Sequence, residues 1–293
     1  MRRKFFYKPI QKNTLSRKLL AKSQQRPFHS VSIPKFEKDA LCEDAAIATS
    51  RMLAVSDGAG GGGVYAERWS AYLLECLPTK PIMSFEALDA WVNGIWERFY
   101  KRCETDVKQR NALFQQKFYE EGAFATLAAA WRTDEDTWQW MAYGDSVVFC
   151  YDIANNILHH SFTCLTDFNN PPYLVSLNDE LQPAGFHAGC FKCQRPYIIF
   201  AATDTLAHYI LTMYEVSRKE DFADDLTAAT HSLSKNSTFV KNAYALPSID
   251  FYHVIKKLCK SYIKKDFKSL MASLLNKRLI GVDDYSLVSY RKR

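Results

Sequence analysis

Long apolar runs, internal repeats and low-complexity segments are absent from this sequence, apart from one short run of glycines. A helix that crosses a bilayer needs about 20 consecutive apolar residues. The longest runs here, such as 197–202, have only the length of a strand. No apolar segment typical of a secretory signal follows Met1. We therefore expect a soluble chain, whose 47% hydrophobic residues are enough to bury a sizeable core.

The eight cysteines lack the pattern of a disulfide framework. They are spread from Cys42 to Cys259, which predicts reduced thiols and a cytoplasmic location. One cluster, His187, Cys190 and Cys193, offers three soft ligands for zinc. No second pair supplies the fourth ligand of a structural site, so we interpret the cluster as ordinary hairpin residues. No cysteine occurs in the Cys-x5-Arg setting of a thiol phosphatase.

The first 26 residues contain no acid, although the chain as a whole carries a formal charge of +6. Without the nine basic residues of this segment, 29 basic residues face 32 acidic ones, which leaves −3 for the remainder. We expect residues 1–30 to be a basic, disordered extension able to contact nucleic acid, anionic lipid or an acidic partner. A transit peptide is the alternative. The basic residues are Arg2, Arg3, Lys4, Lys8, Lys12, Arg17, Lys18, Lys22 and Arg26.

Hydrophobic periodicity predicts strand groups separated by helices, without the regular alternation of βαβ units. The pattern favours an α+β fold, a four-layer α/β/β/α sandwich of two antiparallel sheets flanked by helix pairs, in one domain at 31–293. Strands are expected within 31–57 and at 123–131, 138–152, 196–204 and 285–291, and helices at 64–77, 84–120, 205–214, 219–233 and 249–275.

The glycine loop at Gly58, Gly60 and Gly63 matches the dinucleotide pattern GxGxxG, and it lies between an expected strand and an expected helix. Two features oppose that interpretation. Asp57 would crowd an anionic pyrophosphate, and no second strand ends in an acid about 20 residues later. No Gly-Lys-Ser/Thr follows either, which excludes a P-loop. We favour a metal site in which Asp57 and the Gly58 carbonyl are ligands and the other glycines leave room for a substrate.

Four acidic residues at the edges of strand-like runs support this interpretation. They are Asp44, Asp57, Asp204 and Asp283. Carboxylates gathered from several strand ends would form an oxygen-lined site for Mg²⁺ or Mn²⁺. Taken singly, each could be a cap or a turn residue. Asp204 could cap the helix that follows it, and Asp145 could belong to a hairpin turn.

Several short blocks, in order, resemble the motifs of the metal-dependent protein serine/threonine phosphatase family known as PP2C, in its bacterial form. The most specific is LAVSDGAGG, which resembles the family's Asp-Gly-x-Gly-Gly block. The resemblance covers about 31–293 and implies the sandwich fold expected above. The other blocks are CEDAAI, FATLAAAW, AYGDSVVFCYD, AATDTLAHYI and VDDYSLVSY.

The resemblance implies a binuclear Mg²⁺/Mn²⁺ centre. Asp57 would bridge both ions, the Gly58 carbonyl would complete one shell, and Asp204 and Asp283 would bind the other ion. Asp284 is an alternative to Asp283. The implied reaction is hydrolysis of phosphoserine or phosphothreonine by a water that the two metals activate. Two further acids, Glu43 and Asp44, would hold metal-bound waters.

The chain departs from the family's pattern at several positions. The family's phosphate-binding arginine falls on Asp39, so Lys38 or Lys35 would have to supply that charge. A histidine that can protonate the leaving group falls on Ala59. The glycine after the late aspartate is Thr205. An acid found in some members is replaced by His208, while Asp145 could hold a third ion.

These departures keep a second interpretation open. In it, the chain is a non-catalytic module of the same fold that binds a phosphoprotein or a kinase. For an enzyme, the expected partners are a phosphorylated protein substrate and a cognate kinase.

Overall fold

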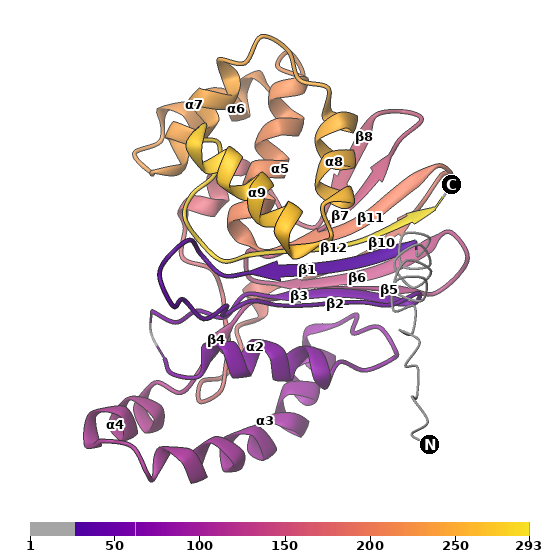
Figure 1. Ribbon diagram of the computed structural model, residues 1–293. Coiled ribbons are helices and arrows are strands. Elements are labelled where there is room, and N and C mark those ends of the chain that lie inside the picture. Colours follow the sequence, from indigo (N-terminus) through magenta and orange to yellow (C-terminus); the bar gives the residue numbers. More distant parts are fainter. Residues whose placement is uncertain (1–26, 62, 293) are drawn as a thin grey trace, which may run out of the picture.

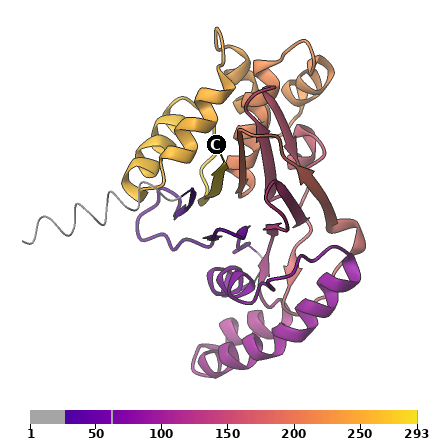
Figure 2. The same cartoon turned by 90° about the vertical axis from the view of Figure 1, so that its right-hand side faces the viewer.

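The computed structural model describes residues 27–61 and 63–292, in which two five-stranded antiparallel sheets pack face to face and strands β4 and β9 form a separate pair. Sheet A has the strand order β1-β12-β11-β7-β8, and sheet B has the order β10-β6-β5-β3-β2. Helices α5–α9 lie outside sheet A, and α2–α4 lie outside sheet B (Figure 1, Figure 2). The expected α+β sandwich of four layers is therefore observed, with five helices on sheet A and three on sheet B among the described residues, rather than a pair on each.

The elements run as follows. The strands are β1 (Phe28–Ile33), β2 (Ala45–Ala48), β3 (Met52–Ser56), β4 (Phe124–Ala125), β5 (Leu127–Arg132), β6 (Thr137–Tyr143), β7 (Val147–Asp152), β8 (Ile157–His160), β9 (Val175–Ser176), β10 (Phe186–Lys192), β11 (Tyr197–Ala202) and β12 (Tyr285–Lys292). The helices are α2 (Ala66–Glu75), α3 (Phe85–Val107), α4 (Ala112–Glu120), α5 (Asp204–Ser217), α6 (Ala223–His231), α7 (Asn236–Tyr244), α8 (Phe251–Lys260) and α9 (Lys264–Asn276). Two short 3-10 helices are η1 (Leu165–Asn169) and η2 (Pro183–Gly185).

Three apolar layers hold the sandwich together. One lies between the sheets, one under α5–α9 and one under α2–α4. Because helices cover the outer faces, a central strand is buried on both sides and is apolar throughout. Strand β11, YIIFAA, is the clearest case, since all six of its residues are buried. This explains why the longest apolar runs of the sequence form strands.

The single helical stretch expected at 84–120 is interrupted and forms two helices, so the prediction of one continuous stretch was wrong. Asn111 accepts a hydrogen bond from the Phe114 N–H and caps a new helix, α4, after α3 has ended at Val107. The stretch expected at 249–275 divides in the same way into α8 and α9, and α8 is capped by Asp250.

Other differences concern short or edge elements. Helix α7 and strands β8 and β9 were not expected. Strand β10 contains His187 and Cys190, which were expected in a hairpin, and it pairs with β6. Strand β1 begins at Phe28, three residues before the expected domain boundary, whereas the basic segment at 1–26 lies outside the described residues. Strand β3 pairs antiparallel with β2 and β5, so the glycine loop is not part of a parallel dinucleotide-binding unit. Within 27–61 and 63–292, no helix has the length and apolarity to span a membrane.

Candidate metal centre

The strand register brings the acidic residues to one end of the sandwich. In sheet B, Ala45 is opposite Ser56 and Leu127 is opposite Tyr143, and in sheet A, Ala202 is opposite both Val147 and Leu287. The three-residue turn between β6 and β7 joins these two ends. Asp44, Asp57, Asp145, Asp204 and Asp283 all lie within two residues of these strand ends.

Hydroxyl groups connect the segments that carry these acids. Thr203 lies between β11 and α5, and its Oγ1 donates to Asp44 Oδ2 at 2.8 Å, joining sheet A to the edge of sheet B. The same oxygen accepts from the Ser286 N–H at 3.1 Å. Thr205 Oγ1 donates to Asp283 Oδ2 at 3.0 Å, so the residue after Asp204 holds the Asp283 side chain.

A second hydroxyl pair connects Asp57 with the β6–β7 turn. Thr126 Oγ1 accepts from the Asp57 N–H at 3.3 Å and lies 2.7 Å from Ser146 Oγ. The Thr126 N–H donates to the Asp57 carbonyl at 2.8 Å. These bonds fix the backbone around Asp57 and Asp145 and leave both carboxyl groups available at the strand ends.

Asp284 is held differently from Asp283. Its two carboxylate oxygens accept from the Lys35 N–H at 2.7 Å and from the Glu43 N–H at 2.5 Å. Asp284 is buried, and these bonds tie the chain after β1 to the start of β12. With both oxygens engaged by backbone donors, Asp284 has a structural role, and Asp283 stays our predicted ligand.

Two glycines of the loop serve close packing. A Cβ at Gly58 would lie 2.5 Å from the Glu43 carbonyl oxygen and 2.7 Å from the Ala66 carbonyl oxygen, so only glycine fits. A Cβ at Gly60 would overlap the Glu43 carboxylate. The loop therefore places Glu43 directly beside the chain that follows Asp57.

The carboxylates raise one another's pKa. Desolvation raises the pKa of Asp57 and of Asp204 well above the usual range, and neighbouring carboxylates, Asp145 among them, raise both further. Desolvation also raises the pKa of Asp44 strongly and that of Asp145 to about 6. Each charged form is thus less favourable here than in water, and a bound cation would relieve this penalty.

Lys35 brings positive charge to the cluster. Burial raises the pKa of Glu43 and of Asp283, and the Lys35 ammonium acts against this at both carboxyl groups. Lys38 is exposed, and Asp39 beside it is exposed with a φ of 58°. Of the two lysines predicted to contact phosphate, Lys35 is the one that influences the acid cluster.

The donor set suits hard divalent cations. Asp44 Oδ1 and Asp145 Oδ1 are buried without a hydrogen-bond partner in the described structure, and a carboxylate oxygen is the ligand that Mg²⁺ and Mn²⁺ prefer. Over residues 27–61 and 63–292, no three His, Cys, Asp or Glu side chains are already arranged as a complete metal-ligand group. The ligand type therefore suits these ions, although the described carboxylates are not yet arranged as a complete coordination shell.

The cluster of His187, Cys190 and Cys193 does not form a site. His187 and Cys190 lie three residues apart on strand β10, so they point to opposite faces. Cys193 instead lies with its Sγ 3.4 Å from the Sγ of Cys150 on β7. His208 is buried against Phe168, and desolvation lowers its pKa to about 4. His187 and Cys190 are exposed, whereas Cys193 and His208 pack against the core.

The supporting hydroxyls of Thr126, Ser146 and Thr203 and the structural role of Asp284 were not predicted from the sequence. Thr126 and Thr203 are small polar residues beside apolar runs, and that contrast is the one signal that could have identified them. Their partners are far away in sequence: 159 residues separate Thr203 from Asp44.

Comparison with protein-family models gave no match. Comparison with curated proteins gave none either.

Solved structures of similar fold are at low identity. The serine/threonine phosphatase Stp1 from Staphylococcus aureus is 12% identical, with 91% of this chain and 94% of that chain covered and a TM-score of 0.48. The catalytic domain of the serine threonine protein phosphatase PstP, solved with two manganese ions, is 15% identical, with 91% and 98% covered and a TM-score of 0.49. PppA, a regulatory component of T6SS in Pseudomonas aeruginosa, is 15% identical, with 90% and 98% covered and a TM-score of 0.47. These values are too low to assign a family or an activity, so the functional proposal depends on the carboxylates described above.

Proposed function

We propose that this chain is a metal-dependent protein phosphatase that hydrolyses phosphoserine and phosphothreonine on proteins with two Mg²⁺ or Mn²⁺ ions. The observation that carries the proposal is the gathering of five carboxylates, from both sheets, at one end of the sandwich. Threonine and serine hydroxyls link the segments that carry them. Burying mutually repelling carboxylates is costly unless a cation compensates for them.

The proposed ligands follow from this placement. Asp57 would contact both ions, the Gly58 carbonyl would add to one of them, and Asp204 and Asp283 would hold the other. Asp145 would hold a third, weaker ion. Divalent ions bound in this way supply Lewis-acid chemistry, which lowers the pKa of water and neutralises charge on a phosphoryl group. Glu43 and Asp44 would act through ordered water.

Two hydroxyl groups orient the acidic side chains of the site, and one lysine adds positive charge beside them. The hydroxyls of Thr203 and Thr205 hold Asp44 and Asp283 in fixed orientations, which is the preorganisation that a metal site needs. Lys35 would attract the phosphate of a substrate as a single positive charge, without the bidentate hydrogen bonds that an arginine makes. We propose a phosphorylated protein as substrate, a cognate kinase as partner and, from the cysteine spacing, a cytoplasmic location.

A second candidate is a non-catalytic module that binds a phosphoprotein or a kinase. The observation in its favour is that the described residues contain no complete metal-ligand group. The exposed Asp39, at the position of the family's phosphate-binding arginine, points the same way.

Hydrolysis of a phosphothreonine peptide, measured over a screen of Mg²⁺ and Mn²⁺, tests the proposal. We expect metal-dependent turnover that Asp57→Ala abolishes. Glu220→Ala, a change at an exposed acid on the far side of sheet A, should leave turnover intact. A wild-type chain that is inactive in every metal but still retains phosphoprotein in a pull-down would favour the binding module.

A further inference from the structure

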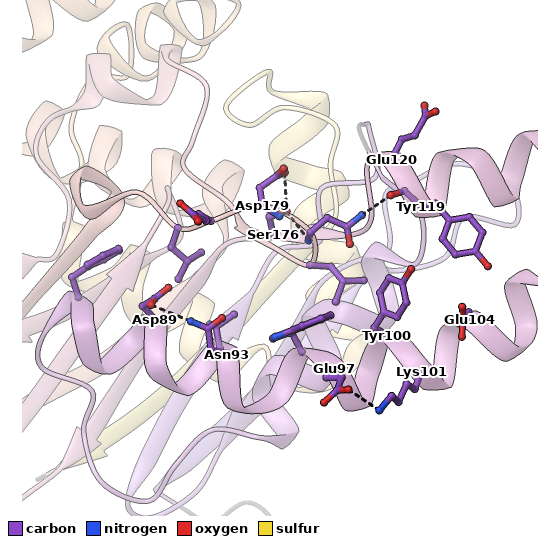
Figure 3. Close-up of a pocket in the computed structure, with 17 residues that line it drawn as sticks. Asp89, Asn93, Glu97, Tyr100, Lys101, Glu104, Tyr119, Glu120, Ser176 and Asp179 are labelled. Atoms are coloured by element: carbon purple, nitrogen blue, oxygen red, sulfur yellow. Dashed lines mark hydrogen bonds and ion pairs between the residues drawn. The ribbon is translucent and has the colours of Figure 1, made fainter.

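One cavity lies away from the acid cluster. It is a groove of about 1,100 Å³ between helix α3, helix α4 and the segment 176–181 (Figure 3). Aromatic side chains line it, among them Trp96 and Tyr100 from α3 and Tyr119 from α4. Tyr119 is 41% exposed. None of the proposed metal ligands lines this groove.

The groove is strongly acidic. Its lining contains six carboxylates and one basic side chain, Lys101, which forms an ion pair with Glu97 at 2.6 Å. Glu104 pairs with Lys108 at 3.1 Å. The six carboxylates are Asp89, Glu97, Glu104, Glu120, Asp179 and Glu180.

Of the other four carboxylates, all but Glu180 accept hydrogen bonds from neutral donors. Asn93 donates to Asp89 at 3.0 Å, Gln116 donates to Glu120 at 3.1 Å, and Ser176 donates to Asp179 at 3.0 Å. These bonds orient the carboxylates without cancelling their charge. The groove therefore combines an excess of negative charge with half-buried and exposed aromatic side chains, which is the chemistry that binds a cationic, partly aromatic peptide.

We propose that this groove is the docking site of residues 1–26 of the same chain. That segment carries nine basic residues and no acid, and it places Phe5, Phe6 and Tyr7 directly after its first three basic residues. Its charge complements that of the groove, and its arginines and lysines suit stacking on Trp96 and Tyr100.

Residues 1–26 are long enough to reach the groove. The segment ends two residues before strand β1, and about 26 residues extend to roughly 85 Å. Because it is tethered to the domain, its effective concentration at the groove is on the order of millimolar, which favours its own chain over a second copy. The groove is separate from the carboxylate cluster, so docking of residues 1–26 does not depend on phosphatase activity.

Photo-crosslinking in the full chain tests the proposal. With benzoylphenylalanine in place of Tyr7, irradiation should join the segment to α3, α4 or 176–181 within the monomer, as mapped by mass spectrometry. The double variant Glu120→Lys, Glu180→Lys should lower the yield about tenfold, and about 0.5 M NaCl should also lower it, because the contact is electrostatic. The matched control Glu220→Lys, Asp224→Lys changes charge equally on the other side of the molecule and should have no effect.

A second variant keeps the test independent of groove folding. Replacing Arg2, Arg3 and Lys4 by Glu leaves the domain untouched and should reduce the same cross-links. Cross-links that scatter over other surfaces, or that do not respond to either set of variants, would overturn the proposal. Cross-links found only in dimers, and rising with protein concentration, would overturn docking within one chain.

Discussion

Asp145→Asn should stabilise the metal-free protein at neutral pH. Asp145 lies in the β6–β7 turn with one buried carboxylate oxygen that lacks a hydrogen-bond partner in the described structure. Desolvation raises its pKa from 3.8 to about 6, and Asp283 adds repulsion. The folded chain therefore binds this proton more tightly than the unfolded chain does. Stability from this group is fully present below pH of about 4 and is lost as the pH rises through about 6.

The magnitude follows from the shift. A rise of about two pKa units, at about 1.4 kcal/mol each, makes the charged group cost about 3 kcal/mol above pH of about 7. Removing that charge should also reduce the electrostatic repulsion on Asp57 and Asp204, whose pKa values Asp145 raises. For a chain of this size, about 3 kcal/mol corresponds to roughly 5 °C in Tm.

Thermal unfolding in EDTA at pH of about 4.5 and about 8 measures this effect. We expect the variant to gain little at the lower pH and to melt several degrees above the wild type at the higher pH. Glu220→Gln, an exposed acid, serves as the control and should melt as the wild type does at both pH values. A stability difference between Asp145→Asn and the wild type that is the same at both pH values would refute the reasoning.

Three further predictions concern the support of the site. Thr203→Val removes the hydroxyl donor of a buried carboxylate and should lower the free energy of unfolding by about 1–3 kcal/mol, measured by urea titration. Gly58→Ala forces a Cβ against two backbone carbonyls and should cost about 1–3 kcal/mol, whereas Gly94→Ala, in open space on helix α3, should stabilise by about 0.5–1 kcal/mol. Lys35→Met should raise KM for a phosphopeptide about tenfold with a smaller change in kcat, while Lys38→Met should leave both constants unchanged.

The strands and the strand-end acids were predictable because they depend on local pattern. A strand buried on both faces must be apolar, as β11 is, and a polar residue directly after it marks the strand's end. The same pattern located Asp57 and Asp204. These positions needed no knowledge of distant contacts.

The rest depended on contacts between distant segments. Nothing near Thr203 in the sequence indicates that its hydroxyl would meet Asp44, and nothing near Asp284 indicates its two backbone donors. The break between α3 and α4 depends on the single cap of Asn111, which the continuing helical periodicity concealed. The acidic groove forms only when the segment 176–181 packs beside α3.

Calorimetric titration of Mn²⁺ into the metal-free chain tests the two-ion site most directly. We expect two ions per wild-type chain, loss of both in Asp57→Asn, and unchanged binding in Glu220→Gln. A wild-type chain that takes up no Mn²⁺, or an Asp57→Asn variant that binds as the wild type does, would contradict the two-ion site.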